Sequence, residues 1–202
     1  MVDVITAVGS VVAMLAMPLG APTPTATDRT VAAPRIEVAA INGSGCPAGT
    51  ATAWSTPDGD AVMVSFDQFT ARAGGGVSPI DQRKNCQVGL RVDNPADWSF
   101  ALEGIEAAGY ADLQSQAVGM HRTTAYFAGE AAQTQVSDTR TGPLHGTWQS
   151  SDTFATPLFS PCGTTRNLNV NTELRVRSDS PDQVSSLELS AVVMYRLTWR
   201  PC

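Results

Sequence analysis

Hydrophobic and polar residues alternate along much of the chain, and the clearest example covers residues 167–176. Apolar or β-branched residues fill every second position there, while asparagine, glutamate and arginine fill the positions between them. A period of two predicts a strand with one face in the core and the other in solvent. The inward set is Leu168, Val170, Thr172, Leu174 and Val176.

The last segment of the chain repeats this pattern over residues 187–199. Val192 and Met194 interrupt its polar face, so the middle of the strand is apolar on both sides. This favours a central position in a sheet, or a bend that changes the inward face. Thirteen residues would span about 43 Å, which is long for one strand, and we therefore expect a bend or bulge.

Shorter alternating runs follow one another between turn signals such as PDGD, AGGG, DNPAD, TGP and SDSPD. They cover residues 36–41, 62–66, 88–92, 98–102 and 122–127. Regularly spaced strands and turns predict an all-β fold, an antiparallel β-sandwich of jelly-roll or immunoglobulin-like type. Residues 102–111 are the only stretch with helical composition, and both a strand pair and a short helix fit them.

The start of the chain differs from the rest, because residues 4–19 are apolar and free of charge. We interpret residues 1–26 as a signal peptide, residues 27–35 as an extended linker and residues 36–202 as one β-sandwich domain. The segment before the apolar run contains Asp3 and no basic residue, so either the start lies upstream or the signal is atypical. An uncleaved anchor and a buried apolar helix are the alternatives; we expect no membrane span in the mature chain.

The charge of the chain limits the kinds of molecule that it is expected to bind. The net charge is −6, and the basic residues, twelve arginines and Lys84, are scattered along the chain without a basic run. This argues against nucleic-acid binding and against a polybasic membrane patch.

Four cysteines, and no CxxC pair, fit disulfide bonds in an exported protein better than a zinc site. Of the three pairings, we favour Cys46 with Cys86 and Cys162 with Cys202, which close two loops of equal separation. On the chain-entropy model, each bond would raise the free energy of unfolding by roughly 4 kcal/mol.

Candidate catalytic groups are few. Ser44 in NGSGC lacks the flanking glycines of a nucleophile elbow. A thiolate at Cys46 would need an imidazole, from His121 or His145, but an even number of cysteines in an exported chain favours a stapled turn. The sequence predicts no catalytic residue, no metal site and no cofactor.

Three pairs of carboxylates have the spacing to act together: Asp58 with Asp60, Glu103 with Glu106, and Asp179 with Asp182. The first and third pairs lie in turn sequences, where Asp caps backbone groups. Calcium binding is the alternative, although neither stretch matches the spacing of a calcium loop. We interpret Glu103 and Glu106 as surface residues.

The outward face of residues 167–173 presents three amides and a carboxylate, a surface suited to sugar hydroxyls if aromatic rings flank it. This candidate binding face consists of Asn167, Asn169, Asn171 and Glu173. An ordinary solvent-facing ladder is the simpler interpretation. The aromatic residues that would flank a sugar are Trp54, Tyr110, Tyr126 and Trp148.

Eight segments, in order, resemble a family of exported actinobacterial and fungal proteins known as domain-of-unknown-function family 4360. They are NGSGCPAGT, FDQFTA, RKNCQVGLRV, GYADL, YFAG, SPCG, LNVNTELRV and WRPC. The resemblance covers about residues 36–202 and implies a secreted, disulfide-containing β domain, with no known activity or cofactor to carry over. The four cysteines fall on the cysteines of that pattern.

Two classes of function follow from these observations. We expect a non-catalytic extracellular module, one that binds an envelope polysaccharide or a protein partner and is either free or attached to the cell wall. The alternative is a secreted enzyme, hydrolase-like, acting on an envelope or environmental polymer. A narrower hypothesis is that residues 27–35 add a strand to a partner.

Overall fold

The computed structural model describes residues 34–189 and 192–202. Within these ranges the chain forms strands and one short 3-10 turn, Pro79–Asp81. The strands are β1 (Arg35–Asn42), β2 (Ala51–Ser55), β3 (Ala61–Phe66), β4 (Phe69–Ala73), β5 (Arg83–Asp93), β6 (Trp98–Leu113), β7 (Val118–Phe127), β8 (Gln133–Thr141), β9 (Leu144–Thr153), β10 (Leu168–Arg177), β11 (Ser185–Leu189) and β12 (Val192–Pro201). The signal peptide and nearly all of the linker lie outside the described residues and stay predictions.

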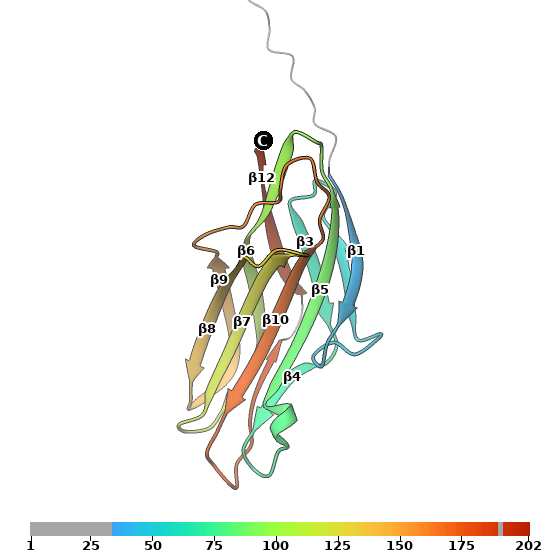
Figure 1. Cartoon of the computed structure of the whole chain (residues 1–202). Helices are drawn as coiled ribbons and strands as arrows, with labels where there is room; N and C mark the ends of the chain where they lie inside the picture. Colours follow the sequence, from blue (N-terminus) through green and yellow to red (C-terminus); the bar gives the residue numbers. More distant parts are fainter. Residues whose placement is uncertain (1–33, 190–191) are drawn as a thin grey trace, which may run out of the picture. The chain divides into compact units, whose positions relative to one another are not determined.

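The strands of the described ranges pair antiparallel in two sheets (Figure 1). Sheet A has the order β1-β5-β10-β7-β8. Sheet B has the order β2-β3-β12-β6-β11-β4, and β9 pairs with the other side of β6. β10 of sheet A packs against β4 and β11 of sheet B. The predicted antiparallel sandwich is therefore confirmed.

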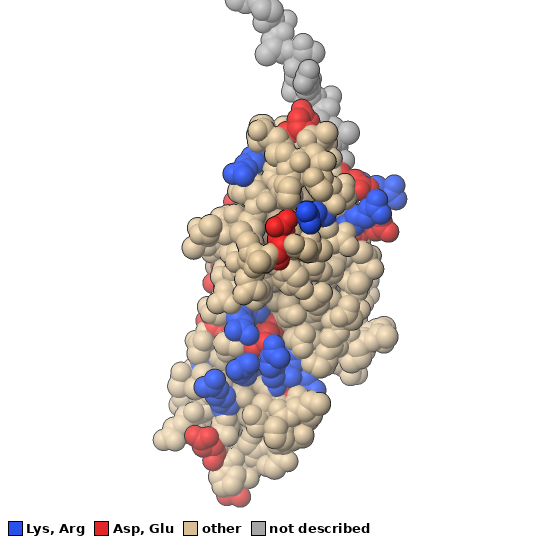
Figure 2. All heavy atoms as spheres, in the orientation of Figure 1, with Lys and Arg blue, Asp and Glu red and all other residues tan. Residues whose placement is uncertain are grey.

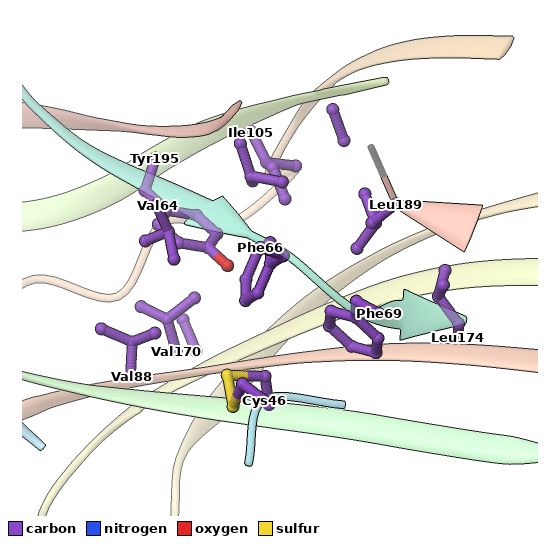
Figure 3. Packing of buried hydrophobic residues seen from close by; sticks show 14 of the residues in the cluster. Cys46, Val64, Phe66, Phe69, Val88, Ile105, Val170, Leu174, Leu189 and Tyr195 are labelled. Atoms are coloured by element: carbon purple, nitrogen blue, oxygen red, sulfur yellow. A yellow bond between two sulfur atoms is a disulfide. The ribbon is translucent and has the colours of Figure 1, made fainter. Parts of the chain in front are cut away.

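Alternation of side chains along each strand builds the core between the sheets. The five apolar or β-branched residues predicted to point inward on β10 are all buried. Val88 and Val170 from sheet A meet Val64 and Tyr195 from sheet B, as Figure 3 shows. Because these side chains come from strands far apart in sequence, core packing fixes how the two sheets face each other.

The last segment behaves as its pattern predicts. β11 and β12 both pair with β6, and β12 lies between β3 and β6, so it is central in sheet B. The register of β12 against β6 shifts after Arg196, where Glu103 of β6 is left without a partner. The extra residue of this bulge belongs to β6, and the segment predicted as one strand consists of two, β11 and β12.

Residues 102–111 lie within the single continuous strand β6, so they form neither a strand pair nor a short helix, although their extended conformation was one of the two expectations. Gly109 lies where there is no room for a side chain, because a Cβ there would lie 1.8 Å from the carbonyl oxygen of Glu188. The close approach of β11 therefore excludes a side chain at this position.

Both predicted disulfides form, Cys46 with Cys86 and Cys162 with Cys202. The NGSGC loop is a turn stapled to β5, and a Cβ on Gly45 would lie 2.2 Å from the Phe69 ring. The first bond is buried, whereas both cysteines of the second are exposed.

Candidate functional site

Glu173 on the outer face of sheet A is surrounded by three arginines. Its side chain is only 3% exposed, although it points away from the core. Nε and Nη2 of Arg83 lie 2.6 and 2.5 Å from Oε2, and Nη2 of Arg122 lies 3.1 Å from Oε1. Nη2 of Arg175 lies 3.4 Å from the same Oε1. We call these four residues the arginine cluster.

Strand register brings the arginine cluster together. Arg122 of β7 lies directly opposite Glu173 of β10, and Arg83 of β5 lies opposite Arg175. Outward side chains on neighbouring strands are then within reach of one another. Figure 2 shows the resulting group of basic side chains around acidic atoms, over the part of the face formed by β7 and β10.

The electrostatics of the cluster keep Glu173 charged. Burial alone would raise the pKa of its carboxyl group. The hydrogen bond from Arg83 and the charges of Arg122, Arg83 and Arg175 outweigh burial and lower that pKa. Three guanidinium groups against one carboxylate leave a local charge of 3 − 1 = +2. The arginine side chains stay 33–54% exposed, so part of each guanidinium group faces solvent, although Nε of Arg175 is buried without a hydrogen-bond partner.

The predicted binding face continues from this cluster along β10. Asn169 and Asn171 share the outward face with Glu173, whereas Asn167 precedes the strand and is exposed. Nε2 of Gln87 donates to Oδ1 of Asn169 at 3.3 Å, and the hydroxyl of Tyr126 donates to Oε1 of Gln87 at 3.1 Å. We call Gln87, Asn169, Asn171 and Tyr126 the polar ladder.

The four candidate aromatic residues separate into three places. Tyr126 lies directly opposite Asn169 in the register of β7 and β10, so one ring does flank the amides. Trp148 is buried between the sheets. Trp54 and Tyr110 belong to sheet B and are 44% and 47% exposed. Only Tyr126 can therefore act with the predicted binding face.

None of the four cysteines is free, so Cys46 is not a thiolate nucleophile. His121 is buried against Trp148, with 5.5 Å between ring centroids, and its Nε2 has no hydrogen-bond partner. Burial, and then the charge of Arg140, lower the pKa of His121 to about 4. A neutral, enclosed imidazole of this kind is part of the core.

His145 is exposed, and its Nδ1 lies 2.6 Å from Oδ1 of Asp112. In the register of sheet B, Asp112 lies opposite His145 on one side and opposite Ser186 on the other. A hydrolytic triad needs the imidazole between the hydroxyl and the carboxylate. Here the carboxylate is in the middle, so this row does not have the order of a triad.

Two of the three carboxylate pairs contribute to one hollow, which Asp58, Asp60 and Glu103 line together, whereas Asp179 and Asp182 do not line it. Oδ1 of Asp58 accepts from the backbone N–H of Asp60 at 3.2 Å, as expected for a turn, and Asp179 and Asp182 are exposed in a loop. Glu106 forms an ion pair with Arg196 at 2.7 Å. In residues 34–189 and 192–202, no group of three or more His, Cys, Asp or Glu residues has an arrangement that could hold a metal ion.

The part of the chain that the structure describes contains no helix of the length and apolarity needed to cross a membrane.

Comparison with known proteins identifies a relative of this chain and the family that it matches. An uncharacterized secreted protein of the fungus Arthroderma benhamiae is 29% identical over 167 residues, covering 79% of this chain and 68% of the fungal protein. That relative and the two disulfides support an extracellular location. Residues 32–202 match the family described as "Domain of unknown function (DUF4360)". Because the match covers most of the sequence, the chain belongs to this family.

Proposed function

We propose that the protein is a non-catalytic extracellular module that binds an anionic polysaccharide on the outer face of sheet A. The arginine cluster is the observation that carries this proposal, because it concentrates positive charge on the surface of a chain with net charge −6. Anionic groups of an envelope polymer, whether carboxylate, sulfate or phosphate, are its ligands.

The geometry of the guanidinium groups supports an anionic ligand. Glu173 holds each arginine by one edge or one nitrogen, and the partly exposed N–H groups remain free to donate to oxygen atoms. Side chains already held in place lose less entropy when they bind, so the cluster is preorganised for its ligand.

The polar ladder supports a carbohydrate over other anions. Amide groups of Gln87, Asn169 and Asn171 lie on the same face as the cluster and suit sugar hydroxyls. The Tyr126 ring at the other end offers an apolar surface for a sugar ring. The distance from Glu173 to Asn169, four residues along the strand, is about 13 Å, which favours a chain over a single sugar.

The test uses the purified secreted protein and three immobilised polymers: polygalacturonate, heparin and dextran. We expect the two anionic polymers to retain the protein and neutral dextran to release it, with retention falling as salt rises. The double variant Arg122→Ala/Arg175→Ala should lose at least about 10-fold in affinity, because two charge-assisted contacts are removed. The matched control is Arg72→Ala/Arg200→Ala, which removes the same charge from two exposed positions outside the cluster.

Equal loss in both double variants would mean that net charge alone drives binding, and would reject the cluster as a site. Binding of duplex DNA as tight as that of either polysaccharide would reject carbohydrate recognition. Hydrolysis of any polymer by the wild-type protein would favour the enzyme alternative.

A further inference from the structure

The outer face of sheet B carries an apolar hollow far from the arginine cluster in the fold. Its floor includes Met63 of β3 and Met194 of β12, which lie directly opposite each other, and Val192, which is 36% exposed. The hollow has a volume of about 420 Å³, within the usual range of ligand pockets. Met63 and Met194 are half-buried and Val192 is exposed, so the three side chains form a short apolar strip on this face.

A second hollow, of about 580 Å³, adjoins the first at Met194, which lines both. Three carboxylates line it, from Asp58, Asp60 and Glu103. Arg196 also lines it, but its Nη1 is engaged with Glu106 at 2.7 Å. Among the described residues none of the three carboxylates forms an ion pair, and with Arg196 counted the lining of this hollow has a net charge of 1 − 3 = −2. We call the two hollows together the β12 groove.

The dimensions of the β12 groove fit an extended chain. Val192 and Thr198 line its two ends, and six residues of strand separate them by about 20 Å. A single small molecule would leave most of that length empty.

The side chains distinguish between kinds of chain. Sugars stack on flat aromatic rings, and none lines the first hollow, where methionine, valine and alanine side chains lie beside Glu106, Gln149, Ser150 and Ser151. One aromatic residue, Trp199, lines the second hollow. Methionine adapts to aliphatic side chains of varied shape and is common at peptide-binding surfaces. The uncompensated carboxylates then complement lysine or arginine.

We propose that the β12 groove binds an extended segment of a partner protein, with aliphatic side chains over Met63, Val192 and Met194 and a basic side chain beside Asp60 and Glu103. Charge complementarity between the acidic hollow and the basic residue sets the direction of the segment. The site is separate from the polysaccharide face, and neither proposal depends on the other.

The test is a library of random 12-residue peptides displayed on phage and selected on the purified secreted protein. We expect the enriched peptides to combine aliphatic residues with lysine or arginine. The variant Met194→Lys should weaken binding of a synthesised enriched peptide at least about 10-fold, because it places a charge on the apolar floor. Val192→Lys, at an exposed position, provides a second variant in case the first impairs folding.

Three further variants complete the test: one removes the charge contacts, and two are controls. Asp60→Asn/Glu103→Gln should weaken binding about 3- to 10-fold and reduce its salt dependence, since the charge contacts are lost. Thr139→Lys, exposed on β8 of sheet A, should leave peptide affinity unchanged, and so should Arg122→Ala/Arg175→Ala.

Three outcomes would overturn the proposal: no peptide enriched above background, enriched peptides that bind both lysine variants normally, or enriched peptides that are acidic. Binding of a chitosan hexamer that Met194→Lys abolishes would show an amino-sugar site instead. Failure of the peptide experiment leaves the polysaccharide result unaffected, because the two tests use different ligands and different variants.

Discussion

The hydroxyl group of Tyr195 lies 2.7 Å from Oγ1 of Thr172, and this buried hydrogen bond joins sheet B to sheet A across the core. Oγ1 of Thr172 lies 3.3 Å from Oγ1 of Thr123 on the neighbouring strand, so three buried hydroxyl groups form a chain. Burial raises the pKa of Tyr195 to about 12, although the hydrogen bond with Thr172 opposes this, so the phenol stays neutral. The inward threonines of β10 and β7 are therefore polar contacts inside an otherwise apolar layer.

Removing the hydroxyl group of Tyr195 and removing that of Thr172 should have unequal effects on the free energy of unfolding. Tyr195→Phe removes the buried hydroxyl cleanly, and we expect a loss of about 1 kcal/mol in the free energy of unfolding. Thr172→Val leaves the Tyr195 hydroxyl buried without its partner and should cost about 2–3 kcal/mol. Urea titration of both variants and of the double variant checks this. A double variant less stable than Thr172→Val would contradict the explanation.

Acid should destabilise the protein through His121. Its pKa is about 4 in the folded state against an ordinary 6.5, so the unfolded chain binds a proton first as the pH falls. Stability is complete above pH 6.5 and decreases by about 3 kcal/mol down to pH 4. The lowered pKa of Glu173 acts in the same direction, but only below about pH 4.5.

The measurement is the urea midpoint at pH 7, 5.5 and 4.5 for wild type, His121→Gln and His145→Gln. We expect His121→Gln to flatten the dependence on pH between 7 and 4.5, while the exposed His145 variant keeps it. An unchanged dependence in His121→Gln would mean that another group is responsible.

Gly109→Ala should destabilise sheet B strongly. The new methyl group would lie 1.8 Å from the carbonyl oxygen of Glu188 and 2.8 Å from atoms of the Trp148 ring, so strands must separate. We expect a loss of about 3 kcal/mol, at the upper end of the range for overpacking. Gly89→Ala is the matched control, because its methyl group would make ordinary contacts at 3.6 Å or more. Similar unfolding midpoints for the two variants would be inconsistent with the packing around β6.

The exposed disulfide should be reduced before the buried one. Cys162 and Cys202 are accessible, while Cys46 and Cys86 are 1% and 0% exposed. Mild reductant followed by alkylation and peptide mapping should therefore label Cys162 and Cys202 first. Simultaneous labelling of all four cysteines would show that reduction requires global unfolding.

Loss of that same bond should weaken the central strand of sheet B. Cys202→Ser, or deletion of Pro201 and Cys202, should cost about 2–5 kcal/mol, since β12 ends at this crosslink. Cys202 also donates its backbone N–H to the carbonyl oxygen of Asp97 at 2.8 Å. Unfolding of both variants at the wild-type urea midpoint would make the end of β12 peripheral to stability.

Alternation predicted most of the strands that carry the core, because inward apolar residues at every second position do not depend on which strands pair. It did not predict β4, although Phe69, Ala71 and Ala73 are fully buried. The edge strand β8 was not predicted: Val136 is its only apolar residue apart from threonine side chains, so it has no hydrophobic signal. The helical interpretation of residues 102–111 failed because the sequence alone does not reveal which strands pack beside this segment. In the structure, neighbouring strands approach closely at Gly104 and Gly109.

The candidate site was predicted in part. The outward position of Glu173 followed from the pattern of β10, but the basic residues were interpreted as scattered. Arg83, Arg122 and Arg175 are separated by 39 and 53 residues in sequence, and only the register of β5, β10 and β7 brings them together. Register depends on turns and on core packing across sheets, so one sequence does not determine it.

The two disulfides also determine how the described domain would respond to mechanical tension applied between residues 34 and 202. Force passes through a covalent crosslink in preference to the peptide chain that the crosslink encloses. Residues 47–85 and 163–201, 39 in each loop, are therefore shielded, and within residues 34–202 the chain can lengthen before Cys46 and between Cys86 and Cys162. The shielded loops contain β10 and β12, so the strand that presents Glu173 and the strand that forms the β12 groove are both protected from direct load.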